Sequence, residues 1–208
     1  MIGIVTAMTD EFNEIFKHIK EVKEKEISAF KYYYGNINNK EVVIVKSNEG
    51  KVNSAIATQT MLLNFDIDFV LNVGIAGSHK LKTYDIAVAS SVIQYDLDAK
   101  ALGYEIGYIF GIDKVKLHCS YSMLKNIPNL GTLATADIFL TDTSRLEEFD
   151  DVIAFDMECG AIAQVCHLNN KDLISIKCIS DSGDNTEFDI FANKAINILT
   201  DYILKEVF

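Results

Sequence analysis

Apolar and polar positions follow two patterns along the chain: short apolar runs, and apolar residues that recur at helical spacing. Ile2–Val5 is a short apolar run, which predicts a buried strand. From about Asp10 to Val22, apolar residues recur at three- and four-residue intervals, which predicts an amphipathic helix. Two further runs, Phe30–Tyr34 and Glu41–Val45, flank a polar turn region and predict a β-hairpin.

The same alternation continues to the end of the chain. Further helices are predicted at Lys51–Leu63, Met157–His167 and Phe188–Leu204. Further strands are predicted at Phe69–Val73, Ile86–Ser91, Gly131–Ala136, Val152–Phe155 and Leu173–Ile179. Strands that alternate with helices, after an early meander of strands, predict an α/β fold. We expect a three-layer α/β/α sandwich around a mixed central sheet.

Composition limits the class of protein. The 208 residues are 49% hydrophobic, so the chain can bury a core that needs no disulfide or metal to hold it. No repeat, low-complexity tract or proline-rich linker divides the sequence, and we expect one domain, residues 1–208. With 19 Lys and Arg against 30 Asp and Glu, the net charge is −11, which argues against nucleic-acid and anionic-membrane partners.

Cysteine spacing and the lack of long apolar runs indicate a cell compartment. No apolar run approaches the roughly 20 residues of a membrane-spanning helix, and the N-terminal residues lack the pattern of a signal peptide. The four cysteines show no C-x-x-C spacing, and we expect them to be reduced and buried. A metal site at Cys166 and His167 is not favoured by their spacing or surroundings. These features predict a cytoplasmic protein without a bound metal.

Three acidic residues follow predicted strands, where side chains reach the edge of the sheet. Glu11 follows the first strand, Glu158 begins a predicted helix, and Asp181 comes directly after Leu173–Ile179. Three carboxyl groups in one crevice could divide acid, base and hydroxyl-binding roles, because unlike environments separate their pKa values. The alternative is that Glu11 and Glu158 only complement the positive ends of their helices.

Two other patterns each allow two interpretations. The Gly74–Ser78 stretch is either a cradle of backbone N–H groups for a phosphate or, as we favour, a tight turn from a strand into a loop. Phe139, Phe188 and Phe191 form either an aromatic wall for a flat base or part of the core. No G-x-S-x-G motif occurs, and no histidine adjoins a plausible nucleophile, so serine and cysteine hydrolases find no support.

Eight short segments, in order along nearly the whole chain, carry a resemblance to one enzyme family. The chain resembles the 5′-methylthioadenosine/S-adenosylhomocysteine nucleosidases, within the nucleoside phosphorylase and nucleosidase superfamily. The Met-Glu pair, the Ser-Asp pair and the N-terminal Ala-Met with a following Glu make the combination specific. The matching segments are Ile2–Glu11, Ser47–Asn53, Asn72–Gly77, Tyr84–Val88, Leu102–Glu105, Ala136–Phe139, Phe155–Cys159 and Ile179–Asp181.

The resemblance implies a three-layer α/β sandwich, a homodimer, and irreversible hydrolysis of an adenine N-glycosidic bond. The expected ligand is a small purine nucleoside with a modified 5′ position, and no cofactor is implied. By position, Asp181 would protonate the purine, Ser180 would orient Asp181, and Glu11 would activate the attacking water. Cleavage of a ribosyl–purine bond builds positive charge on the sugar and negative charge on the base, which calls for these groups.

The resemblance also implies a set of substrate-binding residues. Glu158 would hold the ribose hydroxyls beside Met157, and Phe139 would stack on adenine while the backbone of Phe139 and Leu140 reads the edge of the base. Phe188 is the second aromatic residue that we expect at the base.

Four positions depart from the pattern of the family, and one change is mild: Asp156 replaces the usual Glu before Met157. Ile75 stands where the glycine loop usually has Ser, and Lys177 stands where an Arg commonly lies near the attacking water. Lys keeps the positive charge but lacks the planar fork of Arg. Glu49 replaces an apolar residue of the 5′ pocket. We hypothesise that Glu49 pairs with a polar 5′ substituent, such as a hydroxyl or an amino group; the alternative is that it turns to solvent.

Two other functions remain open at the level of the sequence. One is a phosphorylase or hydrolase of another purine nucleoside. Hydrolysis is favoured because the only arginine, Arg145, lies outside the segments where phosphorylases of the superfamily hold phosphate. The other is a nucleoside-binding protein without activity, which the changes at Ile75 and Lys177 suggest and the presence of Glu11, Glu158 and Asp181 opposes.

Overall fold

The computed structural model describes the backbone of residues 1–208 and every side chain except that of residue 185. Along this backbone, ten strands, four α-helices and two short 3₁₀ helices follow one another. The strands are β1 (Ile2–Thr6), β2 (Lys20–Ile27), β3 (Phe30–Ile37), β4 (Lys40–Lys46), β5 (Phe69–Gly77), β6 (Ile86–Gln94), β7 (Lys116–His118), β8 (Leu130–Thr135), β9 (Val152–Asp156) and β10 (Asp172–Asp181). The helices are α1 (Thr9–Phe16), α2 (Lys51–Asn64), α3 (Cys159–Leu168) and α4 (Asn185–Glu206), with 3₁₀ turns at Lys100–Leu102 and Thr143–Leu146.

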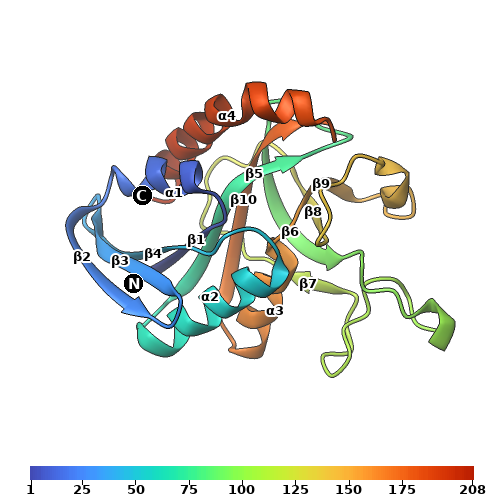
Figure 1. Cartoon of the computed structure of the whole chain (residues 1–208), viewed down its shortest axis with the longest axis horizontal. Coiled ribbons are helices and arrows are strands. Elements are labelled where there is room, and N and C mark those ends of the chain that lie inside the picture. The colour runs from blue at the N-terminus through green and yellow to red at the C-terminus, as the bar shows by residue number, and fades with distance from the viewer.

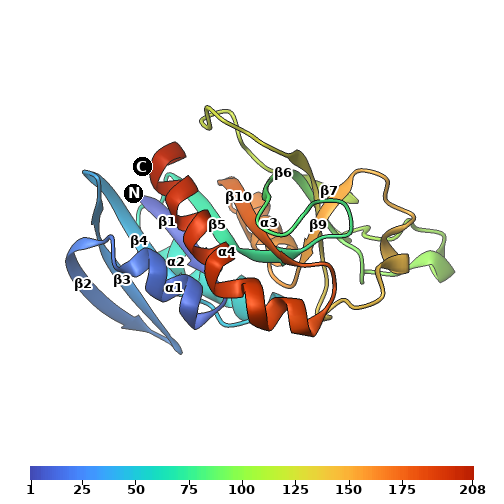
Figure 2. The ribbon, with the colours of Figure 1, turned by 90° about the horizontal axis from the view of Figure 1, so that it is seen from above.

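The strands form one sheet between two layers of helices, which confirms the predicted α/β/α architecture. Helices α1 and α4 lie over one face of the sheet, and α2 and α3 lie over the other (Figure 1). Seen from above, α4 crosses the strands obliquely beside α1 (Figure 2). Side chains alternate across a strand, so on β4 Val43 and Val45 pack toward the α2 side, whereas Val42 and Ile44 pack toward the α4 side.

The sheet is mixed, and part of it closes on itself. Its order is β10-β6-β8-β9-β5-β1-β4-β3-β2, with β7 added beside β6. Strand β10 also pairs with β5 in parallel, so β5, β10, β6, β8 and β9 form a closed ring of strands. The long strands β5, β6 and β10 of this ring are largely buried, which explains why they read as continuous apolar runs in the sequence.

The carboxyl ends of four parallel strands meet at one place. Strand β1 runs parallel to both β4 and β5, and β5 runs parallel to β10. Ligands of α/β sheets bind beyond such strand ends, where the following loops meet. The loop after β1, the loop after β4 and the last residues of β5 and β10 therefore border one region.

Two predicted boundaries are wrong, and both have a physical cause. The helix predicted from Asp10 to Val22 ends at Phe16, and Lys20–Ile27 instead forms strand β2. Strand β2 lies at the edge of the sheet with exposed, charged side chains, so it lacks the apolar alternation that marks a strand. The predicted turn at Gly74–Ser78 is in fact strand for residues 74–77, because β5 continues to Gly77.

Several expectations about cysteines and membranes can be compared with the structure. All four cysteines are free and buried, as predicted. Within the described residues, Cys166 and His167 belong to no cluster of three or more metal-ligating side chains. No helix in this part of the chain combines the length and the apolar character needed to cross a bilayer.

Candidate active site

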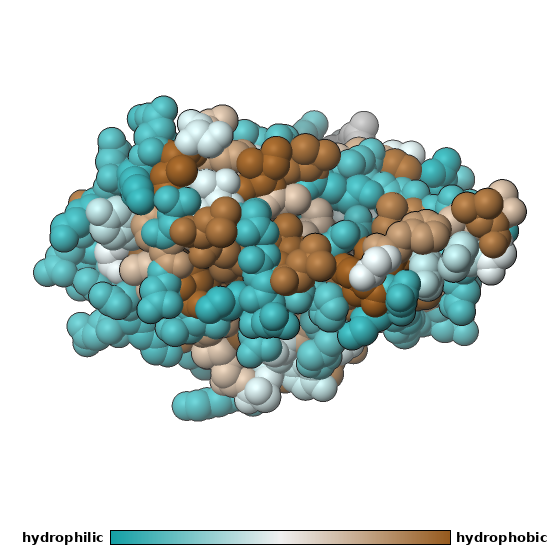
Figure 3. Space-filling view, turned by 90° about the horizontal axis from the view of Figure 1, so that it is seen from below, coloured by the Kyte–Doolittle hydropathy of each residue, from teal (hydrophilic) through white to brown (hydrophobic). Residues whose placement is uncertain are grey.

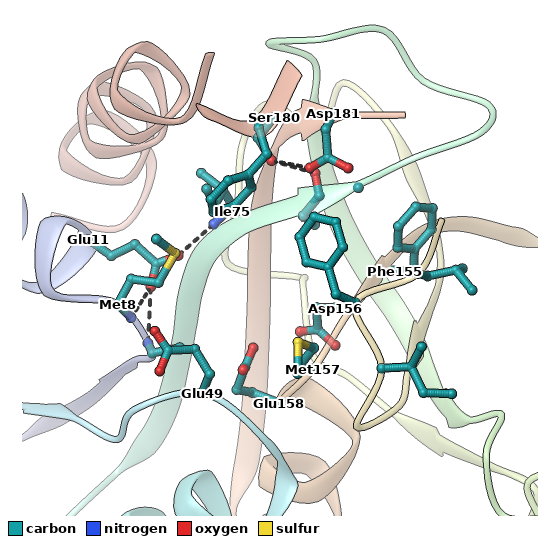
Figure 4. A pocket seen from close by; sticks show the side chains of 17 residues that line it. Met8, Glu11, Glu49, Ile75, Phe155, Asp156, Met157, Glu158, Ser180 and Asp181 are labelled. Atoms are coloured by element: carbon teal, nitrogen blue, oxygen red, sulfur yellow. Dashed lines mark hydrogen bonds between the residues drawn. The ribbon is translucent and has the colours of Figure 1, made fainter. Parts of the chain in front are cut away.

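A cavity of about 280 Å³ opens where the strand ends meet (Figure 4). Ten of the eleven predicted site residues line it; the exception is Lys177. The lining residues foreseen from the sequence are Glu11, Glu49, Ile75, Phe139, Leu140, Met157, Glu158, Ser180, Asp181 and Phe188. The cavity thus brings together side chains from the first turn of α1 to the first turns of α4.

Glu11 is held in the cavity wall by backbone groups from two elements. One carboxylate oxygen accepts hydrogen bonds from the N–H groups of Ala7 (3.0 Å) and Met8 (2.9 Å), and the other accepts from the N–H of Ile75 (2.9 Å). Burial raises the pKa of Glu11, while Lys177 and the three N–H groups act in the opposite direction. Glu11 is therefore fixed in orientation and poised to accept a proton.

The glycine at position 74 allows Glu11 to come this close. A Cβ atom on Gly74 would lie 2.6 Å from Glu11 Oε1, too close for two unbonded atoms. Because Gly74 carries only a hydrogen at this place, the carboxylate can approach strand β5 and accept the N–H of Ile75. Gly74 therefore lies within a strand, not in the predicted turn, and makes room for Glu11.

Glu158 faces the same cavity from the start of α3. It is only 7% exposed, and its Oε1 accepts a hydrogen bond from the Gly50 N–H at 2.9 Å. Burial raises the pKa of Glu158 to about 8, and the neighbouring Asp156 acts in the same direction, against the opposing effects of Lys177 and the Gly50 N–H. Glu158 and Glu11 thus share a cavity but differ in how firmly backbone donors hold them.

A buried ion pair stands behind these two carboxyl groups. Lys177 Nζ lies 2.8 Å from Asp156 Oδ2, and both side chains are 2% exposed. Asp156 also accepts hydrogen bonds from Thr135 Oγ1 (2.6 Å) and the Cys159 N–H. Burial alone would lower the pKa of Lys177, but the Asp156 carboxylate and the other acidic groups around it outweigh burial and raise it. Lys177 is therefore a buried counter-ion for the acidic cavity.

Lys177 is the one residue expected to bind substrate that does not line the cavity. Lys177 is on strand β10 and points into the protein toward Asp156, so its ammonium group does not line the cavity. Sequence reasoning treated Asp156 only as a mild change and missed the pair. The available signal was a lysine inside the apolar strand Leu173–Ile179, because a fully buried lysine requires an anionic partner.

Asp181 and Ser180 occupy the end of β10 at the other side of the cavity. Ser180 Oγ donates a hydrogen bond to Asp181 Oδ2 at 2.7 Å, and the Gly183 N–H donates to Oδ1 at 2.9 Å. Asp181 is 4% exposed. A Cβ atom on Gly77 would collide with the ring of Phe155 and lie 3.0 Å from Asp181 Oδ1, so this glycine keeps the approach to Asp181 open.

Aromatic side chains form one wall of the cavity, which is the first of the two alternatives considered for Phe139 and Phe188. Phe139 and Phe188 meet edge to face with ring centroids 5.8 Å apart, and Phe139 is 44% exposed. Phe191 is not part of this wall: it packs against Tyr84 instead. Phe155, which the sequence analysis did not select, also lines the cavity, directly before the Asp156–Glu158 segment.

The ionisable side chains among the described residues of the cavity wall are all acidic. The acidic lining residues are Glu11, Glu49, Asp156, Glu158 and Asp181. Among the described side chains that line the cavity, none is lysine, arginine or histidine. Arg145 lies in the 3₁₀ helix Thr143–Leu146, away from this lining. The cavity can therefore transfer protons and bind hydroxyl groups, but it presents no cation to a phosphate anion.

Comparison with known proteins gives consistent matches over nearly the whole chain. Residues 1–207 match the Phosphorylase superfamily. A 5′-methylthioadenosine/S-adenosylhomocysteine nucleosidase of Exiguobacterium sp. is 34% identical over 213 residues, covering 93% of this chain and 91% of that protein.

Two solved structures extend the comparison to the fold. The same type of nucleosidase from Neisseria meningitidis, in complex with methylthio-immucillin-A, matches with a TM-score of 0.93 and 26% identity, covering 99% of this chain and 97% of that chain. Futalosine hydrolase of Helicobacter pylori matches with a TM-score of 0.90 and 28% identity, covering 97% and 94%. The chain is thus similar to proteins that are named for different nucleosides.

Proposed function

This chain belongs to the phosphorylase superfamily and is a purine nucleoside N-ribohydrolase of 5′-modified adenosines, and we propose that Glu11 and Asp181 are its catalytic carboxyl groups. The reaction adds water across the bond between the sugar and the base, and it releases adenine and the ribosyl moiety. The roles of individual residues follow from where each group stands around the cavity.

We propose that Glu11 is the general base. Its carboxylate is fixed by three backbone N–H groups and borders the open cavity, so it can accept the proton of an attacking water molecule. The water oxygen forms the new bond to the anomeric carbon of the sugar as the bond to the purine nitrogen breaks. The buried, negatively charged wall stabilises the positive charge that develops on the sugar ring.

Asp181 acts at the base. A carboxyl group that donates its proton to a ring nitrogen of the departing purine leaves a neutral base and a carboxylate. Ser180 Oγ and the Gly183 N–H then donate hydrogen bonds to that carboxylate, at 2.7 and 2.9 Å in the structure. Ser180 is thus a positioning residue, and Asp181 is the acid.

The remaining lining residues bind the nucleoside. Glu158 accepts hydrogen bonds from the ribose hydroxyls beside Met157, and Phe139 packs on the face of adenine with Phe188 at its edge. The backbone of Leu140 lies next to Phe139 and reads the polar edge of the base. Ile75 contributes its N–H to Glu11 and its side chain to the wall of the sugar site.

The observation that carries this function is the charge of the cavity. Three buried carboxyl groups converge on it, and the described lining residues include no cation. A phosphorylase must bind a phosphate anion beside the anomeric carbon, and an acidic wall repels that anion. Water, which is neutral, is the nucleophile that this cavity accepts.

Release of free purine tests the proposal. Methylthioadenosine, S-adenosylhomocysteine, adenosine and inosine are incubated with the protein with and without phosphate, and the bases are separated by chromatography. We expect adenine from the 5′-modified adenosines at a rate that phosphate does not change. Acceleration by phosphate would indicate a phosphorylase, and release only from inosine would indicate another purine nucleoside. Thermal stabilisation by a nucleoside without any release would indicate a binding protein without activity.

We also propose that the chain forms a homodimer through the face covered by α2 and α3. Figure 3 shows apolar side chains gathered in patches on this face. They include Val52 (68% exposed), Ile56 and Leu63 (73% exposed) on α2 and Leu168 on α3. Exposed apolar groups of this kind mark interaction surfaces. Light scattering after size-exclusion chromatography should give twice the chain mass, and the variant Val52→Lys should give a monomer.

We propose further that residues 1–208 fold as one cytoplasmic domain. Every strand of the described backbone belongs to one sheet, and the two largest apolar cores lie on its two faces. Four free, buried thiols suit a reducing compartment. A single cooperative unfolding transition, the same by fluorescence and circular dichroism, would support one domain.

A further inference from the structure

Glu49 lies at the end of the cavity opposite Asp181. Figure 4 shows Asp181 and Ser180 at one end and Glu49 with Met8 at the other, with Glu11 and Glu158 toward the Glu49 side. A nucleoside whose base lies at Asp181 and whose ribose lies at Glu11 and Glu158 extends its 5′ substituent toward Glu49. The 5′ carbon is attached at C4′, on the other side of the ring oxygen from C1′, so it leaves the ribose away from the base and, in this placement, toward Glu49.

The backbone holds Glu49 in a defined position relative to the sugar site. Its neighbours Asn48 and Gly50 have positive φ angles of 63° and 94°, which turn the chain sharply on both sides of it. The N–H of Gly50 donates to Glu158 Oε1 at 2.9 Å, and Asn53 Nδ2 donates to the Glu49 carbonyl at 2.8 Å. Glu49 therefore keeps its place beside the ribose-binding carboxyl group.

The Glu49 carboxylate has no protein partner within the described part of the chain. The hydrogen bond recorded at Glu49 uses its backbone carbonyl. The two nearest lysines along the chain are engaged elsewhere: Lys51 Nζ lies 2.7 Å from Asp96, and Lys46 Nζ donates to Thr9 Oγ1. An exposed carboxylate at the mouth of a cavity lined by further acidic side chains attracts a cation.

We propose that Glu49 is a specificity-determining residue that binds an ammonium group on the 5′ substituent of the nucleoside. This inference rests on the nucleosidase function proposed above and names the substrate class of the same cavity. The preferred class is a 5′-thioether of adenosine whose side chain ends in a primary amine, as the homocysteine chain of S-adenosylhomocysteine does. A small apolar substituent such as methylthio leaves Glu49 without a partner, and an anionic substituent is repelled.

A series of substrates that differ in the charge of the 5′ chain tests this proposal. The probes are methylthioadenosine (neutral), 5′-aminopropylthio-adenosine (cationic), S-adenosylhomocysteine (zwitterionic) and 5′-carboxypropylthio-adenosine (anionic). We expect kcat/KM to be about three- to fivefold higher for the cationic than for the neutral probe, the range of an exposed ion pair. The anionic probe should be the poorest, and added salt should reduce all these differences.

The variant Glu49→Gln isolates the contribution of the carboxylate. It should abolish the preference for the cationic over the neutral probe, and Glu49→Lys should reverse the order of the cationic and anionic probes. Because the 5′ chain is remote from the bond that breaks, the change should fall mainly on KM. Glu41→Gln is the matched control, since it removes the same charge from an exposed position at the opposite end of β4.

The outcomes separate this inference from the function on which it depends. If all probes release adenine and the ratio of cationic to neutral probe is the same in the original protein and in Glu49→Gln, Glu49 does not select the substituent. If Glu41→Gln changes the ratio as much as Glu49→Gln does, the effect belongs to net charge and the proposal is wrong. If no probe releases adenine from any variant, it is the nucleosidase function that fails.

Discussion

The carboxylates of the inner wall of the cavity and the carboxylate at its outer rim differ in burial and in hydrogen bonding. Inside, Glu11 accepts three backbone hydrogen bonds, Glu158 accepts one, and a buried lysine and aspartate stand behind them. At the rim, Glu49 is exposed, and no described donor contacts its carboxylate. The inner groups are thus fixed before substrate binds, whereas the Glu49 carboxylate is free to bind a group of the substrate.

The difference reflects what each region does. Charge that develops during bond cleavage is stabilised best by groups that need not reorient, so the inner wall is buried and held by the backbone. A substituent far from the breaking bond contributes through binding, so a hydrated side chain at the rim is sufficient. Changes to the carboxyl groups of the cavity should therefore affect turnover strongly, and loss of the buried ion pair should affect folding. Changes at the rim should affect only the choice of substrate.

The largest effect is expected from Asp181→Asn. The amide has nearly the same shape: its oxygen can accept from the Gly183 N–H, and its NH2 group can donate to Ser180 Oγ, so folding should be intact. Without a proton to donate, kcat should fall by up to about 10⁴-fold, the upper range for general acid catalysis. Steady-state adenine release measures this change, with Asp189→Asn at an exposed position of α4 as control. Near-normal kcat in the Asp181→Asn variant would remove Asp181 from the mechanism.

The next largest effect is expected on stability, from Lys177→Met. This change leaves Asp156 buried without its counter-ion, which costs about 3–5 kcal/mol of unfolding free energy. Urea denaturation measures the loss. Lys23→Met, at an exposed position of β2, is the control.

A second variant shows whether the loss comes from the pair. Replacing both partners, Asp156→Asn with Lys177→Met, should recover part of the stability because no charge is then left unpaired. A double variant as unstable as the sum of its single changes would contradict the role of the pair.

The buried carboxyl groups should make the free energy of unfolding depend on pH. The folded protein holds the Glu158 proton up to about pH 8, whereas the unfolded chain releases it near the ordinary pKa of 4.5. The folded state thus binds more protons, so stability is highest below pH 4.5 as far as this group is concerned and is lost as pH rises toward 8. The raised pKa of Glu11 acts in the same direction.

The variant Glu158→Gln tests how much of this pH dependence comes from Glu158. Each pKa unit corresponds to about 1.4 kcal/mol, so Glu158 can account for a few kcal/mol between about pH 5 and 8. Thermal unfolding across that range should give a flatter stability curve for the Glu158→Gln variant than for the original protein. Identical curves would show that Glu158 ionises normally in the folded state.

A smaller effect is expected from Gly74→Ala. The added methyl group would lie 2.6 Å from Glu11 Oε1, so the Glu11 carboxylate must move away from the Ile75 N–H. Displacement of a catalytic base by a fraction of an ångström to an ångström should lower kcat about ten- to hundredfold. The melting temperature serves as the control for folding. Unchanged kcat would mean that the position of Glu11 is less critical than its hydrogen bonds suggest.

The sequence predicted the buried parts of the fold and most of the cavity. Apolar runs located β1, β5, β6, β8, β9 and β10, and the acidic residues that follow strands led to Glu11, Glu158 and Asp181. Strand β2 was not predicted because its side chains are charged and exposed. It is a strand through its backbone pairing with β3, which the sequence pattern does not reveal.

Contacts between distant elements set the limit of prediction. The Asp156–Lys177 pair joins the end of β9 to the middle of β10, and no local spacing relates them. The glycines of β5 look like a turn until the Glu11 carboxylate and the Phe155 ring are placed against them. The sequence left open whether Phe139, Phe188 and Phe191 form an aromatic wall or part of the core, and only the direction of each side chain on the folded chain places Phe191 against Tyr84.

The identity of the sugar product tests the central claim most directly. The protein is incubated with methylthioadenosine in phosphate buffer, and the sugar that is released is identified by mass spectrometry. An acidic cavity that uses water predicts free methylthioribose, formed at a rate independent of phosphate concentration. Formation of the sugar 1-phosphate would contradict the account, because it would place a phosphate anion against the carboxylates that line the cavity.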